Sequence, residues 1–272
     1  MIANEALPSY SGGIAEIYDK YLVPLIFEPY AIDLAQRVAE LPLTNVLEIA
    51  AGTGVVTRRL AMALPGSVFI IATDLQQSML DQAVSVGTSR PVEWRQADAL
   101  ELPYDKGSFD AVVCQFGVMF FPDRVRAFAE ARRVLRRGGV FIFNVWDRIE
   151  DNDFARLVTE ALAGLFPADP PSSMARVPHE YHDIATIRRD LAAAGFQAAA
   201  QVSTLAERSR AASAHIPAVA FCQGTPLRNE IEARDVEQLA TATAAVEAAI
   251  AAQFGHAAVD GKMQAHVVQI EA

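Results

Sequence analysis

Residues 46–54 read VLEIAAGTG, an apolar run that passes through Glu48 into two closely spaced glycines. The run has the length of a buried strand. Glycine directly after a first strand lets the backbone turn tightly and lets a ligand approach it closely. The carboxylate of Glu48 would repel a pyrophosphate and attract a cationic amino-acid group. The stretch therefore predicts the first strand and ligand-binding loop of an α/β nucleotide-binding fold.

Short apolar or β-branched runs alternate with segments of helical periodicity from residue 44 onward. This alternation specifies a parallel sheet with helices on both faces. The expected strands are 44–49, 67–73, 92–95, 109–114, 140–146, 196–205 and 266–270, and the expected helices are 55–63, 78–86, 124–135, 182–194, 212–223 and 229–254. Residues 136–139 (RRGG) are expected to form a turn. We expect a doubly wound, Rossmann-like, mostly parallel seven-stranded sheet with helical insertions after the fifth and sixth strands.

The composition narrows the range of partners. The chain has 272 residues, 52% of them hydrophobic, and a net charge of −10, which fits a packed globule with an acidic surface. Such a surface repels phosphate backbones, so we expect no nucleic acid partner. The two cysteines lack the spacing of a zinc site or a disulfide framework, and we expect no metal. No basic leader or membrane-length apolar run is present, and we expect a cytoplasmic protein that does not enter a membrane.

Asp74 lies 20 residues after Gly54, at the end of the second expected strand. A carboxylate there can accept both hydroxyls of a ribose, in a dinucleotide enzyme and in other nucleotide folds alike. The dinucleotide pattern G-x-G-x-x-G needs a third glycine, and Thr57 stands at that position. No Tyr-x-x-x-Lys pair for hydride transfer is found. An NAD-dependent oxidoreductase therefore stays only as an alternative.

Residues 44–146 resemble the class I S-adenosylmethionine-dependent methyltransferases of the small-molecule type, the type 11-like group. The first motif of that family, acid-x-Gly-x-Gly-x-Gly, is matched by residues 48–54, with Ala50 in place of the first glycine. The resemblance implies that Glu48 lies near the ammonium of the methionine moiety and contacts it through water or backbone amides. It also implies that Ala50, Gly52 and Gly54 leave room for the chain and the ribose of the cofactor.

The resemblance also extends to later segments of the core. It implies that Asp74 contacts the ribose and that the adenine is contacted by Leu75, Met79, Asp98 and Ala99. It places Gln115, Phe116 and Gly117 beside the sulfonium. It also implies a closing lid that carries Tyr18 and Tyr21. Each assignment has a plainer alternative. Met79 and the lid tyrosines also suit core packing, and Asp98 also suits a turn cap. On this interpretation the chain is one domain, with a helical lid at 1–40, a cofactor-binding core at 44–146, and an acceptor-side cover together with the last strands at 147–272.

The implied reaction is transfer of a methyl group from S-adenosylmethionine to a small-molecule acceptor at oxygen, nitrogen or carbon, with S-adenosylhomocysteine as product. Such an in-line displacement needs no nucleophilic residue, but a hydroxyl acceptor benefits from a general base. His179 and His182 are the candidates, because they fall where the insertion after the fifth strand meets the next helix. A surface or capping role for each stays open. A catalytically silent S-adenosylmethionine-binding protein is the other alternative, and assembly as a homodimer is left open.

Overall fold

The structure is a computed structural model that describes residues 13–272, so Tyr10 and the first part of the expected lid lie outside the described residues. Its centre is one seven-stranded sheet of order β3-β2-β1-β4-β5-β7-β6. The strands are β1 (Asn45–Ile49), β2 (Phe69–Asp74), β3 (Glu93–Gln96), β4 (Phe109–Gln115), β5 (Leu135–Trp146), β6 (Gln201–Ala211) and β7 (Val259–Glu271). Strands β1 to β5 are parallel, and β7 runs antiparallel to both β5 and β6. The expected doubly wound, mostly parallel sheet is confirmed.

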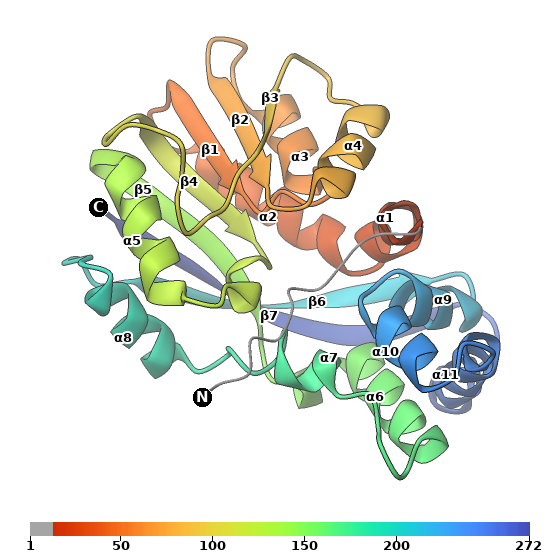
Figure 1. Ribbon diagram of the computed structural model, residues 1–272. Coiled ribbons are helices and arrows are strands. Elements are labelled where there is room, and N and C mark those ends of the chain that lie inside the picture. The colour runs from red at the N-terminus through yellow and green to blue at the C-terminus, as the bar shows by residue number, and fades with distance from the viewer. Residues whose placement is uncertain (1–12) are drawn as a thin grey trace.

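Helices cover both faces of this sheet (Figure 1). They are α1 (Ile14–Ile17), α2 (Glu28–Ala39), α3 (Val55–Ala63), α4 (Gln77–Val86), α5 (Arg124–Val134), α6 (Asp153–Leu165), α7 (Ser173–Arg176), α8 (Ile184–Ala193), α9 (His215–Gln223), α10 (Leu227–Arg234) and α11 (Gln238–Phe254). A π-helical segment, η1 (Tyr18–Phe27), joins α1 to α2, and the short turns η2 (Val118–Phe120) and η3 (Ile149–Asp151) follow β4 and β5. Helices α2 to α4 lie on one face of the parallel part of the sheet, and α5 and α8 lie on the other (Figure 1).

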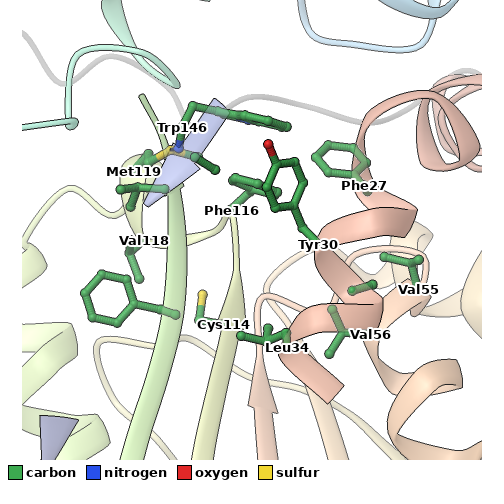
Figure 2. Packing of buried hydrophobic residues seen from close by; sticks show 14 of the residues in the cluster. Phe27, Tyr30, Leu34, Val55, Val56, Cys114, Phe116, Val118, Met119 and Trp146 are labelled. Atoms are coloured by element: carbon green, nitrogen blue, oxygen red, sulfur yellow. Dashed lines mark hydrogen bonds between the residues drawn. The ribbon is translucent and has the colours of Figure 1, made fainter. Parts of the chain in front are cut away.

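The parallel strands were predictable because they are apolar and buried on both faces. Residues 109–114 of β4 are all buried, as are residues 141–146 of β5. Their register pairs Val112 with Phe141 and Cys114 with Phe143. Figure 2 shows the packing of buried side chains from β4, β5 and α2 around this centre. A strand buried on both sides is apolar at most positions of both faces, which is why the apolar run is nearly continuous here.

The last two strands differ from expectation. Strand β6 begins five residues later than expected and extends to Ala211, and β7 begins at Val259, where a helical cover was expected. The two strands pair along their whole lengths, from Gln201 opposite Gln269 to Ala211 opposite Val259. Residues 201–211 are mostly polar because β6 is an edge strand with many exposed positions. Residues 206–211 and 259–262 thus extend the sheet and do not form part of the helical cover.

Two smaller boundaries were also wrong. The expected helix 229–254 is divided into α10 and α11, because Asp235 adopts extended backbone angles (φ −165°, ψ 117°). Residues 136–139, expected as a turn, belong to β5, which carries a register shift against β4 at this point. Gly138 has a positive φ of 74° there, a conformation that glycine adopts without strain.

Helices α6, α9, α10 and α11 gather around the outer part of the β6–β7 pair, beyond the parallel strands (Figure 1). Helix α9 packs against η1, and α11 packs against both α6 and α9. This helical group therefore closes over the same end of the sheet at which the loops after β1, β2 and β4 emerge. Within residues 13–272, no helix combines the length and the apolarity that crossing a membrane requires.

Candidate active site

A cavity of about 260 Å³ lies at the carboxyl ends of the parallel strands, between the sheet, η1 and the helical group. Open α/β sheets bind their ligands at this edge. Eleven of the residues expected to bind the cofactor line the cavity: Tyr18, Ala50, Gly52, Asp74, Leu75, Met79, Asp98, Ala99, Gln115, Phe116 and Gly117. They come from segments that are far apart in the sequence, and the parallel topology brings them to one place.

Asp74, the last residue of β2, ties together two loops of the cavity. One carboxylate oxygen accepts a hydrogen bond from the Gly52 backbone N–H, and the other accepts one from the Gln76 backbone N–H, both at 2.8 Å. Each oxygen keeps a lone pair for a ligand hydroxyl. Burial raises the pKa of Asp74, while these backbone hydrogen bonds oppose that rise. A methyl group added at Gly52 would approach Met79 Cε and the Tyr18 hydroxyl, so the absence of a side chain keeps this part of the cavity open.

Asp98 follows β3 and is exposed at the cavity edge. Its Oδ1 atom accepts a hydrogen bond from the Leu100 N–H at 2.8 Å, so it does cap the local turn. Within the described chain no partner is found for Oδ2. Asp98 can therefore cap the turn and contact a ligand at the same time. Ala99 lies beside Asp98 in the cavity wall.

Glu48 is buried behind the cavity wall and does not line the cavity itself. Its carboxyl group is 1% exposed and accepts a hydrogen bond from the Thr57 hydroxyl at 2.5 Å, below the loop and outside the cavity wall. Burial is the largest influence on its pKa and raises it to about 8, so the group is mainly protonated at neutral pH. The side chain is turned toward the start of α3, and the structure gives it no direct contact with the cavity.

Gly54 has a different role from the expected one, because it does not line the cavity. Its φ is 82°, and a Cβ atom built on it would lie 2.7 Å from Trp94 Cη2 and 3.2 Å from Ala83 Cβ. The room that this glycine leaves is filled by Trp94 of β3 and by Ala83 of α4. Gly54 therefore serves close packing between the loop and the sheet, and Gly52 is the glycine that faces the cavity.

Replacing Gly54 with alanine is expected to lower the free energy of unfolding by about 2–4 kcal/mol, because the new methyl group overpacks the Trp94 contact and the positive φ disfavours alanine. Urea unfolding measures the change. Gly66→Ala is the matched control, since a Cβ there meets nothing within 4 Å. Equal effects of the two substitutions would contradict this account of Gly54.

An aromatic cluster forms the cavity floor at the ends of β4 and β5. Phe116 stacks on Trp146 with ring centroids 3.8 Å apart and an angle of 6°, and Tyr30 packs edge-on against both rings (Figure 2). Phe116 has a positive φ of 51°, which is uncommon for an aromatic residue and occurs mostly at functional sites. A Cβ on Gly117 would lie 2.5 Å from Ala50 Cβ, so this glycine lets the loops after β4 and β1 touch.

The two lid candidates are placed differently. Tyr18 lines the cavity and stacks on Phe27 with centroids 5.2 Å apart. Tyr21 is half-buried and does not line the cavity, and the Lys20 ammonium lies 4.8 Å from the centre of its ring. The backbone of η1 turns Tyr18 toward the cavity and Tyr21 toward the surface.

Several residues of the cavity wall were not found by sequence reasoning. They are Trp146, Phe120, Phe121, Phe154, Met174, Phe221, Lys262 and Met263. Trp146 ends the apolar fifth strand and could have been assigned from that position, as Gln115 was at the end of the fourth. Phe120 and Phe121 lie at the end of the turn η2, just after Gln115, Phe116 and Gly117, and could have been assigned with them. The remaining residues depend on how α7, the helical group and the β6–β7 pair fold back over the sheet, and no local pattern reports that.

Of the two histidine candidates, His179 reaches the cavity wall and His182 does not. His179 Nδ1 lies 2.8 Å from the Asp147 carbonyl oxygen. Since a carbonyl only accepts, Nδ1 carries the proton and Nε2 keeps a free lone pair. Burial, the largest influence, lowers the pKa of His179 to about 4, so the ring is neutral at physiological pH. His182 donates from Nδ1 to the His179 carbonyl oxygen at 2.8 Å and so supports the turn behind the wall.

The cavity thus lies at the carboxyl edge of a doubly wound sheet, with the Asp74 carboxylate in its wall and a covered, apolar extension. Residues 47–143 match the family described as "Methyltransferase domain". An uncharacterised protein of Mycobacterium tuberculosis is 42% identical over 97 residues, which are 35% of this chain and 34% of that protein. A ubiquinone/menaquinone biosynthesis C-methyltransferase of Citrifermentans bemidjiense is 37% identical over 102 residues, 36% of this chain and 43% of that enzyme. The matches span less than half the length of these two relatives.

A solved structure extends the similarity of fold to nearly the whole chain. The Haemonchus contortus phosphoethanolamine N-methyltransferase 2, described in complex with phosphomonomethylethanolamine and S-adenosylhomocysteine, has a TM-score of 0.58 at 16% identity and covers 95% of this chain and 57% of that chain. Residues 47–143 are thus similar in sequence to a methyltransferase domain, and the fold around them is similar to that of a solved methyltransferase.

Proposed function

We propose that this chain transfers a methyl group from S-adenosylmethionine to a small-molecule acceptor. The observation that carries the proposal is one continuous cavity, in which the Asp74–Gly52 cradle and an apolar space beneath the helical group share walls. A cofactor and an acceptor held in such a cavity are brought together away from bulk water, as a displacement at a methyl group requires.

The residues present fit the cofactor. Asp74 would accept the two ribose hydroxyls, Asp98 and Ala99 would meet the adenine, and Leu75 and Met79 would enclose it. Gln115 supports the fit independently, because its side-chain carbonyl oxygen is buried without a partner among the described residues and so calls for a ligand donor. When bound, S-adenosylmethionine supplies an electrophilic methyl group on a sulfonium.

The remaining residues would position the reactants and exclude water. Phe116, held in place by its stack on Trp146, would form one wall beside the reacting atoms, and Tyr18 would close the opposite side. Aromatic faces attract cations, so these rings suit a neighbouring sulfonium. The acceptor side is bounded by α6, α7, α9 and α10, whose residues Phe154, Met174, Phe221 and Leu227 reach the cavity. This covered space supports a small acceptor rather than a polymer.

The proposal is tested by incubating the chain with S-adenosylmethionine and a panel of neutral hydroxyl compounds, amines and carbon acids, and measuring the S-adenosylhomocysteine formed. The expected result is release of S-adenosylhomocysteine that depends on both the protein and an acceptor. Release at the rate of the protein-free control with every acceptor, together with normal cofactor binding, would favour the catalytically silent alternative.

A further inference from the structure

We propose that the acceptor is an uncharged, apolar molecule that bears a hydroxyl group, and that His179 takes the hydroxyl proton as the methyl group is transferred. This inference rests on the proposed function and names the substrate class of the same site. It is carried by the charge and the hydrogen-bonding capacity of the side chains that line the acceptor side of the cavity.

The acceptor side offers apolar surface. Phe120, Phe121, Phe154, Met174, Phe221 and Met263 line it, next to the Phe116–Trp146 stack. Aromatic and methionine side chains bind flat apolar groups well and give no fixed charge to an ionic one. The molecule that fills this space is therefore mainly apolar.

Charged groups on the cavity wall are few and already paired or distant. Among the described lining residues, the carboxylates are Asp74 and Asp98, both on the cofactor side. Lys262 is the positively charged residue among the described lining residues, and its ammonium lies 2.8 Å from the Asp151 carboxylate. A methyl acceptor that carries an ammonium group would have no carboxylate beside the apolar wall to pair with. The positively charged sulfonium of the cofactor would repel it in a space of low dielectric. An anionic acceptor would have to share the Lys262 ammonium with the Asp151 carboxylate, which would repel it.

His179 offers a hydrogen-bond acceptor on this wall. Its Nε2 atom keeps a lone pair, since Nδ1 is held by the Asp147 carbonyl oxygen. A hydroxyl group can donate to Nε2, whereas an ionised carboxylate or phosphate offers it no proton.

Asp147 is itself fixed, so the histidine is held in one orientation. The Asn152 side-chain amide donates to the Asp147 carbonyl oxygen at 3.3 Å, and the Gln264 amide donates to the Asp147 carboxylate at 2.6 Å. The groups that influence the titration of His179 are Asp147, Glu150 and His182, and burial outweighs all three. The ring stays neutral, so its Nε2 lone pair is available.

The proposed methyl transfer conserves atoms and charge. The hydroxyl oxygen forms a bond to the methyl carbon, the bond from that carbon to sulfur breaks, and its electron pair stays on the sulfur. The hydroxyl proton passes to His179 Nε2, so the positive charge moves from the sulfonium to the imidazolium. The products are an ether, S-adenosylhomocysteine and protonated His179, which returns its proton to water when the site opens.

The first test measures binding of four matched probes to the protein saturated with S-adenosylhomocysteine: 2-naphthol, 2-methoxynaphthalene, 2-naphthoate and 2-naphthylmethylammonium. We expect 2-naphthol to bind at least about 10-fold more tightly than each of the other three. Equal or tighter binding of a charged probe, or no measurable binding of 2-naphthol, overturns the inference. Saturation with S-adenosylhomocysteine is established first, so a failure of the proposed function is recognised separately by the absence of that binding.

The second test separates binding from proton transfer. His179→Ala is expected to weaken 2-naphthol binding about 10-fold and to lower its methylation by at least about 100-fold. His179→Gln keeps a donor for the Asp147 carbonyl and an acceptor for the hydroxyl, so binding should return toward wild type while turnover stays low. Unchanged affinity for S-adenosylhomocysteine reports that both variants are folded. His215→Ala, exposed on α9 and paired with Glu247, is the matched control with wild-type turnover. Wild-type turnover in His179→Gln would overturn the role of His179.

Discussion

Replacement of Asp74 by alanine is expected to weaken the binding of S-adenosylhomocysteine by at least about 100-fold, because two charge-assisted hydrogen bonds to the ribose are lost together. The substitution also removes the acceptors of the Gly52 and Gln76 N–H groups, so the two loops that form the cradle lose their common anchor. Both losses weaken the binding of S-adenosylhomocysteine. Isothermal titration calorimetry measures the change.

Two further variants define the origin of the Asp74 effect. Asp74→Asn keeps the shape of the side chain but turns an NH2 group toward one of the two backbone N–H donors, so a large part of the loss is expected to remain. Asp81→Ala removes an exposed carboxylate of α4 that is bonded to Gln77, and wild-type affinity is expected there. An Asp74→Ala protein that is folded and binds within about 3-fold of wild type would remove Asp74 from the site.

The second large effect concerns stability and pH. Glu48 has an ordinary pKa of 4.5 and a pKa of about 8 in the folded protein, mainly through burial. A raised pKa means that the folded state holds the proton more tightly than the unfolded state. The contribution of the group to stability is therefore complete below about pH 4.5 and is lost as the pH rises through 8. At pH 9 the buried carboxylate should cost the folded state about 3–5 kcal/mol relative to pH 4.5.

Glu48→Gln isolates this effect because glutamine has no proton to lose. We expect the unfolding free energy of the variant to exceed that of the wild type increasingly between pH 5.5 and pH 9, and urea unfolding at several pH values measures the difference. Glu93→Gln, at an exposed position on β3, is the control and should show no such trend. A difference between the wild type and Glu48→Gln that does not vary with pH would mean that the carboxyl group is not buried as described.

The parts of the fold that could be predicted are those in which local pattern and final environment agree. Strands β1, β2, β4 and β5 are apolar runs that end up buried, and Asp74 and Gln115 stand at the ends of two of them, where parallel topology alone brings them together. The boundaries of β6 were missed because this edge strand carries many polar, exposed residues. The start of β7 was missed because its residues 259–264 pair with β6 alone, beyond the end of β5.

The missed features of the site depend on contacts between distant segments. The direction of the Glu48 carboxyl is decided by the Thr57 hydroxyl at the start of α3, and the packing of Gly54 by Trp94 on β3. Neither neighbour is visible in the motif itself. His179 and His182 were both named by their position in the chain. The structure distinguishes them, because the Asp147 carbonyl oxygen holds the His179 ring at the cavity wall, whereas the His182 ring is bonded to the His179 carbonyl oxygen behind that wall.

The central claim is that the cavity at the ends of the parallel strands holds S-adenosylmethionine, and calorimetric titration of the wild-type chain tests it most directly. S-adenosylmethionine and S-adenosylhomocysteine should each bind at one site per chain with a dissociation constant on the order of micromolar, and NAD should give no heat of binding. Absence of binding by both sulfur ligands, or binding of NAD in their place, would contradict the claim.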